Sequence, residues 1–157
     1  MNSRCSAQPQ RKGEIMQTVN HLLKVKGTEI FSVTPQDSVL RAIEVMATRH
    51  VGALLVMNQG SLLGIISERD YARKVILHGR SSAETPVWQI MSSPVITVSP
   101  GQTVQDCMHL MTERRVRHLP VVDGGQVVGI VSIGDLVKAV IEEQQQTIEQ
   151  LESYIHH

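Results

Sequence analysis

The sequence is poor in aromatic residues and carries no net charge, and each of these features limits what the protein can do. Aromatic residues make up 3% of the 157 residues, although 41% are hydrophobic, so Val, Ile, Leu and Met must build the core. Lys and Arg together number 15, and Asp and Glu together also number 15, so the formal net charge is zero. Because nucleic-acid-binding domains usually carry a basic footprint, we expect no nucleic-acid partner.

Cysteine is scarce, and long apolar runs are absent. Cys5 and Cys107 are too few for a disulfide framework and do not form a CxxC pair. A transmembrane helix needs a run of about 18 apolar residues, and the sequence has none. The N-terminal residues lack the apolar centre of a signal peptide. We therefore expect a protein of a reducing compartment, located in the cytoplasm, with no membrane partner and a buried free thiol at Cys107.

Sequence motifs for catalysis and metal binding are also missing. The chain contains no GxSxG nucleophile elbow, no phosphate-binding loop of the GxxxxGK type and no HExxH zinc motif. His50, His78 and His109 are scattered and lack the spacing of metal ligands. We predict a protein that is not an enzyme and has no catalytic residue, catalytic cofactor or metal site.

The most informative feature present is an internal repeat. Residues 33–75 align without a gap with residues 98–140. The paired positions include Met46/Met111, Gly64/Gly129, Ser67/Ser132 and Asp70/Asp135. Two copies are too few for a solenoid, so we expect a pseudo-twofold arrangement in which each copy covers the apolar face of the other.

Each copy predicts the element order strand, helix, strand, strand, helix. Apolar residues recur at helical spacing, glycine-containing turns separate the two later strands, and Ser67 and Ser132 are good N-caps. The predicted helices are 38–49 and 68–77 in the first copy and 103–114 and 133–142 in the second; the predicted hairpin strands are 53–57 with 62–66 and 118–122 with 127–131. The fold class is α+β, with two pseudo-symmetric β-α-β-β-α units packed sheet to sheet.

The sequence divides into five segments: a disordered lead (1–13), a first unit with a leading helix at 14–25 (14–77), a connector (78–92), a second unit (93–141) and a helical extension (142–157). We expect Trp88 and Ile90 to hold the connector against the body. The last helix and its extension carry an apolar stripe, formed by Ile141, Ile148, Leu151 and Ile155. This stripe packs on the same chain or forms a dimer contact, and the sequence leaves both readings open.

Three motifs, GIISERD (64–70), RHLPVV (117–122) and GIVSIGD (129–135), together with the repeat, resemble tandem CBS-domain proteins. This regulatory module is named after cystathionine β-synthase, and the resemblance, over residues 16–141, is to the stand-alone bacterial type. It implies a homodimer that binds AMP, ADP, ATP or NAD(H) as a regulatory ligand and signals to a partner protein by a change in conformation or assembly. The alternative is a ligand-free interaction module that regulates a partner enzyme.

The repeated Gly-x-x-Ser-x-x-Asp pattern has a chemical logic of its own. Ser67 and Ser132 end a strand and begin a helix, where exposed N–H groups and the positive end of the dipole favour phosphate. Asp70 and Asp135 fall in the first helical turn, where a carboxylate can accept hydrogen bonds from ribose hydroxyls. The structural alternative is a plain N-cap with a first-turn acid. For the repeated Gly64 and Gly129 we favour close packing over ligand contact.

The resemblance adds roles for further residues. It implies that each Asp holds a ribose, that adenine enters an apolar slot beside Thr34 or Ser99, and that Arg117 and His118 reach the ligand held by Asp70 in the other half. Arg69 adds a phosphate contact there, whereas its counterpart Gly134 leaves the Asp135 site roomier and poorer in charge. We therefore predict that the Asp70 site is the stronger one for phosphorylated ligands, unless Arg117 is a plain surface residue and His118 a partly buried one. The full predicted ligand set is Thr34, Ile65, Ser67, Arg69, Asp70, Ser99, Arg117, His118, Pro120, Ile130, Ser132, Gly134 and Asp135.

Overall fold

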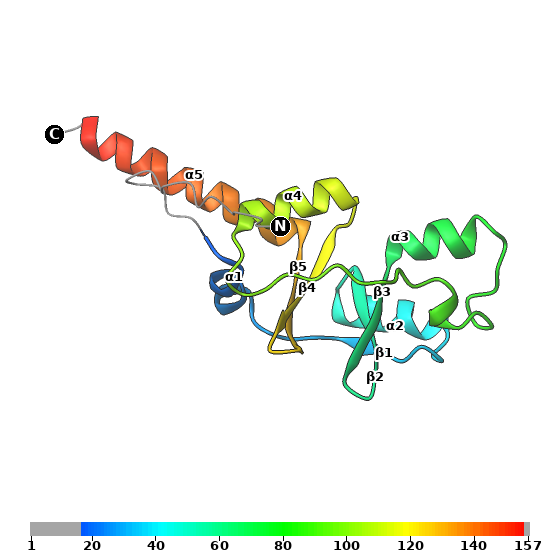
Figure 1. Ribbon diagram of the computed structural model, residues 1–157. Helices are drawn as coiled ribbons and strands as arrows, with labels where there is room; N and C mark the ends of the chain where they lie inside the picture. Colours follow the sequence, from blue (N-terminus) through cyan, green and yellow to red (C-terminus); the bar gives the residue numbers. More distant parts are fainter. Residues whose placement is uncertain (1–16, 156–157) are drawn as a thin grey trace.

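The computed structural model describes residues 17–155 and consists of two halves related by the repeat (Figure 1). The predicted disordered lead (1–13), the first residues of the predicted leading helix and Cys5 lie outside the described residues. The fold class is α+β as predicted: the first half follows the order β-α-β-β-α, and the second half follows the same order without its first strand. Each half contains an antiparallel hairpin followed directly by a helix, and that junction positions the candidate site.

The first half forms a three-stranded sheet. Its elements are β1 (Ser32–Val33), α2 (Val39–Arg49), β2 (Ala53–Asn58), β3 (Ser61–Ser67) and α3 (Glu68–Tyr71). The strand order is β1-β2-β3, with β1 parallel and β3 antiparallel to β2. Gln59 and Gly60 both have positive φ, 50° and 82°, as a two-residue hairpin turn requires. The predicted helix 68–77 is only partly α-helical, because Ala72–Ile76 form a π-helix.

The second half repeats this arrangement with one strand fewer. Its elements are α4 (Val104–Arg114), β4 (His118–Asp123), β5 (Gln126–Ser132) and α5 (Ile133–Ile155). The predicted first strand of this copy is reduced to one parallel bridge between Val98 and Val121. The tail continues the last helix, as predicted, so that α5 reaches 23 residues.

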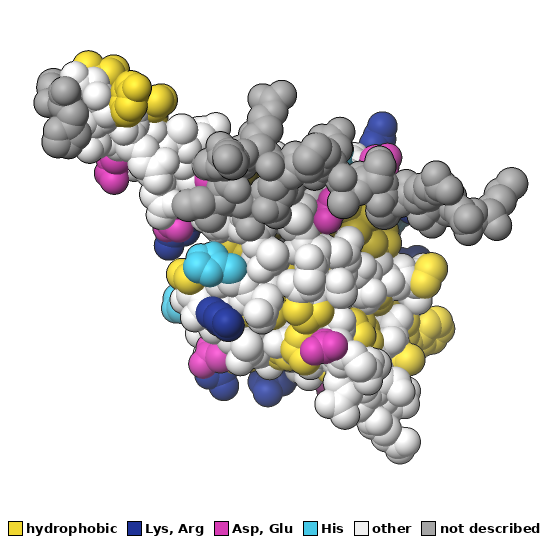
Figure 2. All heavy atoms as spheres, turned by 60° about the vertical axis from the view of Figure 1, so that its left-hand side comes forward, with side chains coloured by type: hydrophobic (Ala, Val, Ile, Leu, Met, Phe, Trp, Pro, Cys, Tyr) yellow, Lys and Arg dark blue, Asp and Glu magenta, His cyan; other side chains and the backbone are white. Residues whose placement is uncertain are grey.

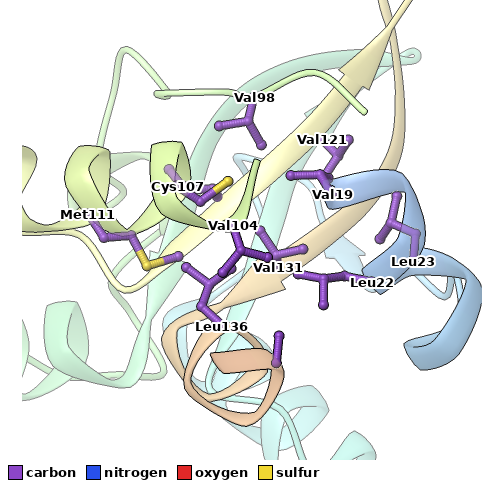
Figure 3. Close-up of a cluster of buried hydrophobic side chains, with 12 residues drawn as sticks. Val19, Leu22, Leu23, Val98, Val104, Cys107, Met111, Val121, Val131 and Leu136 are labelled. Atoms are coloured by element: carbon purple, nitrogen blue, oxygen red, sulfur yellow. The ribbon is translucent and has the colours of Figure 1, made fainter. Parts of the chain in front are cut away.

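Two short segments are exchanged between the halves: each precedes one copy of the repeat in the sequence but packs in the core of the other half. The helix α1 (Val19–Lys26) precedes the first copy in the chain, but its residues Val19, Leu22 and Leu23 belong to the core of the second half (Figure 3). Val87, in the 3-10 helix Val87–Gln89, and Ile90 precede the second copy and are buried in the core of the first. The two halves are thereby tied together, and α1 lies beside the second-half elements in Figure 1.

The connector is held as predicted by Ile90 but not by Trp88. Ile90 is fully buried, whereas Trp88 is 53% exposed. The backbone N–H of Trp88 donates to the carbonyl of Pro35 at 3.1 Å. The backbone therefore fixes the position of Trp88, and its ring faces solvent.

The paired glycines serve close packing, as the sequence suggested. A Cβ on Gly64 would lie 2.6 Å from Sδ of Met91, and one on Gly129 would lie 2.6 Å from Cδ2 of Leu23. Leu23 belongs to α1, and Met91 directly follows Ile90 at the end of the other exchanged segment. Glycine at these positions therefore lets each exchanged segment approach the sheet of the other half.

Candidate functional site

Asp70 is fixed at the start of α3 by a capping box. Its Oδ2 accepts hydrogen bonds from the Ser67 backbone N–H and from Ser67 Oγ, both at 3.0 Å. In return the Ser67 hydroxyl accepts from the Asp70 N–H at 3.2 Å. Oδ1 takes longer contacts, 3.3 Å from Ser92 Oγ and 3.2 Å from Nζ of Lys74. The side chain of Asp70 is 13% exposed, and its hydrogen bonds to Ser67 fix its position.

Asp70 lies in a cleft of about 440 Å³ between the two halves of the molecule. This volume is in the range of small-molecule sites. The first half contributes the end of β3 and the start of α3, and the second half contributes the end of α4 and the residues that lead into β4. The lining residues are Gly52, Ile65, Ser67, Glu68, Arg69, Asp70, Arg73, Lys74, Ser92, Arg114, Arg115, Val116, Arg117 and His118.

The cleft is strongly basic. Six Lys and Arg side chains line it, against two carboxylates. The pKa of the Arg69 guanidinium is lowered, first by the charge of Arg73, then by desolvation and by the charge of Arg117, while Asp70 opposes the shift. Positive charges from both halves are thus crowded together without enough acidic partners. An anion in the cleft would relieve this repulsion.

Two of the cleft-lining residues missed by sequence reasoning, Arg114 and Arg115, end α4. Arg115 adopts the left-handed conformation, with φ 54° and ψ 41°. Its repeat counterpart His50 does the same at the end of α2, with φ 55°. A non-glycine residue with positive φ is uncommon and often marks a functional site. The sequence signal that could have found these residues was the pair of adjacent arginines, Arg114 and Arg115, just before the RHLPVV motif.

Asp135 occupies the equivalent place in a second cleft of about 350 Å³. Its Oδ2 accepts from the Ser132 N–H at 2.8 Å and pairs with Nζ of Lys26 at 2.5 Å. Lys26 also donates to the carbonyl of Ile130 at 2.7 Å. Burial raises the pKa of Asp135, but the hydrogen bonds from Lys26 and Ser132 outweigh it and hold that pKa below its ordinary value.

Lys26 was not among the predicted ligand residues. It belongs to α1, and it reaches Asp135 only because α1 packs on the second half. The second cleft also contains Glu29, Arg49, His50 and His118. Its acidic and basic side chains are close to balance, unlike those of the Asp70 cleft.

His118 lies between the two clefts and lines both. Its Nε2 faces Gly52, where an added Cβ would lie 3.7 Å away. Burial lowers the pKa of the imidazole, the charges of Lys26 and Arg117 lower it further, and Asp135 and Asp70 oppose them. His118 is therefore neutral near pH 7 and borders on charged residues of both sites.

The structure brings most of the predicted ligand residues together. Ile65, Ser67, Arg69, Asp70, Arg117 and His118 line the first cleft, and Ile130, Ser132, Asp135 and His118 line the second. The remaining four, Thr34, Ser99, Pro120 and Gly134, line neither. The backbone N–H of Thr34 bonds to Asp37 and that of Ser99 to Gln102, Pro120 is buried in β4, and Gly134 lies on the outer face of α5.

The described part of the chain shows neither a cluster of metal ligands nor a membrane-spanning helix. Within residues 17–155, no three His, Cys, Asp or Glu side chains converge as metal ligands do. Over the same residues, no helix is long and apolar enough to cross a bilayer.

Cys107 is a buried free thiol, as predicted, and burial together with the charge of Asp106 raises its pKa to about 11. Its thiol is therefore protonated at neutral pH and unreactive.

Comparison with known proteins places the chain in a family. The profile of the CBS domain matches residues 14–76 and 87–142. The mitochondrial CBS domain-containing protein CBSX3 of Arabidopsis thaliana is 41% identical, over 96% of this chain and 79% of its own. A CBS-domain protein from Burkholderia ambifaria MC40-6 has a solved structure that is 51% identical, with a TM-score of 0.79 over 82% of this chain and 96% of its own.

The chain therefore belongs to the CBS-domain family, as the sequence motifs indicated, and its two matches form a CBS domain pair. CBS domain pairs generally serve as regulatory modules. The fold is shared with the CBS domain pair of the protein MJ0100, which was solved in complex with 5′-methylthioadenosine and S-adenosyl-L-methionine; it is 23% identical, with a TM-score of 0.73 over 82% of this chain and 98% of its own.

Proposed function

We propose that this protein is a regulatory CBS pair that binds a phosphorylated adenine nucleotide, AMP, ADP, ATP or NAD(H), in the Asp70 cleft. The observation that carries this proposal is the meeting of two features in one cavity. A carboxylate held at a helix start comes from the first half, and a group of guanidinium side chains comes from the second. Ribose and phosphate are the two parts of a nucleotide that such groups recognise.

In the proposed complex the ribose hydroxyls donate to Oδ1 of Asp70. They replace the contact from Ser92 Oγ, which at 3.3 Å is the longest made by this carboxylate. The phosphates lie toward Arg69 and Arg117, and Ile65 offers an apolar contact to the base. The relative MJ0100 supports an adenosyl ligand for this fold, although its ligands carry no phosphate. The surplus of basic side chains in the Asp70 cleft favours phosphorylated ligands in this chain.

The proposed signal is a change in how the two halves pack. A nucleotide in the Asp70 cleft touches α3 of the first half and the α4–β4 connection of the second, so it stabilises the arrangement in which both are within reach. A ligand shifts such an equilibrium only by its differential affinity for the two arrangements. We propose that the protein acts as a cytoplasmic homodimer and that a partner protein reads the change. The free thiol of Cys107 is compatible with a reducing compartment.

Calorimetric titration of Asp70→Asn and Asp135→Asn with AMP, ATP, NAD and NADH tests the proposal. Asparagine keeps an oxygen that can accept from the capped N–H but removes the charge. We expect Asp70→Asn to weaken nucleotide binding by between about tenfold and about a hundredfold, the value of a charged hydrogen bond. Asp135→Asn should have a smaller effect.

Asp106→Asn is the matched control, because Asp106 forms the same kind of capping box with Thr103 on the exposed side of α4. It should leave the affinity unchanged. Binding that is lost only in Asp135→Asn would place the nucleotide in the other cleft. A folded wild-type protein that binds none of the four nucleotides would overturn the proposed function and favour an interaction module.

A further inference from the structure

The helix α5 has two apolar faces, and the described residues of the chain cover only one of them. Leu136 and Ala139 are buried in the core of the second half. On another face Val137 is 44% exposed and Ile141 59% exposed. The helix then continues past the body of the molecule to Ile155 (Figure 1), where Figure 2 shows hydrophobic side chains gathered near its end.

The exposed face continues over the whole extension. Ile148 is 48% exposed, Leu151 58% and Ile155 77%. Every residue from 144 to 155 is exposed. The structure thus gives no support to the reading that this stripe packs on the described part of the same chain. An isolated helix of this length is marginal in water, so a partner surface is needed to stabilise it.

The spacing of the exposed residues is that of a coiled coil. Ile141, Ile148 and Ile155 recur every seven residues and occupy the a positions of a heptad repeat. Val137 and Leu151 occupy d positions, and Gln144 occupies the d position between them. Ile at a with Leu at d favours a parallel two-stranded coiled coil, and a single polar core residue fixes the register.

Charge also favours a second copy of this chain over other occupants. Residues 142–155 contain four Glu and no Lys or Arg, which disfavours an anionic surface such as a membrane or nucleic acid. In a parallel, in-register pair, the flanking positions that face each other are Val140 with Gln145 and Thr147 with Glu152. No like charges meet there. Tyr154, 83% exposed, lies beside the core and extends the apolar surface.

We propose that residues 137–155 of α5 form a parallel two-stranded coiled coil with the same segment of a second copy. This inference deepens the proposed homodimer by assigning its interface and orientation. It does not depend on nucleotide binding, because the Asp70 cleft contains no residue of this segment. Two adjacent CBS pairs would then be joined at one end by their extensions, with the Asp70 clefts left open.

Disulfide cross-linking tests the interface in the full chain. In a Cys5→Ser background, with Cys107 buried, Leu151→Cys places a thiol at the core of the proposed coil, where two copies of the same residue face each other. Mild oxidation should convert most of the protein into a covalent dimer. Ser153→Cys is the control, because residue 153 lies on the opposite face of the coil and its thiols should stay reduced.

A second pair of variants measures the association itself. Ile148→Glu with Leu151→Glu should abolish the dimer in sedimentation velocity, whereas Gln146→Glu with Ser153→Glu adds the same charge on the opposite face and should preserve it. Wild-type protein that sediments as a monomer, equal cross-linking at 151 and 153, or a dimer that survives both core substitutions would overturn the proposal. Nucleotide titration of the same variants separates the two proposals, because a failed coil leaves nucleotide affinity unchanged.

Discussion

At the residue scale, two equivalent aspartates differ in what surrounds them. Asp70 and Asp135 start equivalent helices and bond to equivalent serines. Asp135 is neutralised by Lys26 at 2.5 Å. Asp70 has Lys74 at 3.2 Å, and further basic side chains line its cleft without carboxylate partners of their own in the described residues. The repeat predicts two similar carboxylates, but among the described residues the Asp70 cleft carries the larger surplus of positive charge, and we therefore propose it as the stronger anion site.

Arg115 offers a substitution with opposite effects on stability and binding. Its left-handed backbone costs an L-residue about 1 kcal/mol, which glycine avoids. We expect Arg115→Gly to raise the free energy of unfolding in urea by up to about 1 kcal/mol, while ATP affinity falls because the cleft loses a guanidinium. His50→Gly, the counterpart on α2, should raise stability without changing ATP affinity. Unchanged ATP affinity in Arg115→Gly would show that this side chain does not serve the ligand.

His118 predicts a specific dependence of stability on pH. Burial and the nearby Lys26 and Arg117 hold its pKa below the ordinary value of 6.5. The folded state therefore binds fewer protons than the unfolded state below that pH, so stability is lost as the pH falls from 6.5 toward the folded pKa. We expect His118→Gln to lose less stability than wild type between pH 7 and pH 5, measured by urea unfolding. Parallel pH curves for the two proteins would contradict the assignment.

At the element scale, the exchanged segments depend on glycines in the strands. An Ala at position 129 would place its Cβ 2.6 Å from the buried side chain of Leu23. Overpacking of this kind costs about 1–3 kcal/mol, so Gly129→Ala should lower the free energy of unfolding by that amount. The added cost should shrink in a Leu23→Ala background. Gly101→Ala is the control, since nothing lies within 4 Å of its Cβ position, and a matching loss there would rule out the packing explanation.

The sequence predicts elements well where the signal is local. Helical spacing, the Gln59-Gly60 and Gly124-Gly125 turns and the serine N-caps correctly placed the hairpins and the helices that flank them. The π-helix at Ala72–Ile76 was missed, because a change from i→i+4 to i→i+5 bonding leaves the apolar pattern nearly unaltered. The prediction of a first strand in the second copy was wrong. A strand is defined by a run of paired residues, and Val98 forms only a single bridge, to Val121.

At the scale of the whole molecule, the candidate site depends on how the halves meet. The presence of Arg117 and His118 beside Asp70 was implied by the family resemblance, and the structure places them in one cleft. Lys26 could not be assigned from the sequence, because its contact with Asp135 requires α1 to pack on the half that it does not precede. Arg73 and Lys74 follow Asp70 by three and four residues, a helical spacing that could have predicted their position.

The same arrangement makes the Asp70 cleft a bridge between the halves. A nucleotide there would touch the capping box of α3 and the basic residues after α4 at once, and the cleft of about 440 Å³ is shared between them. A regulatory ligand must bind the two arrangements of the halves with different affinities, and contacts with both halves would provide that difference.

A crystal structure of the protein grown with ATP tests that claim most directly. The account predicts density for the nucleotide in the Asp70 cleft, with the ribose hydroxyls within hydrogen-bonding distance of Asp70 and the phosphates within reach of Arg117. Density confined to the Asp135 cleft, or a nucleotide that contacts residues of only one half, would contradict it.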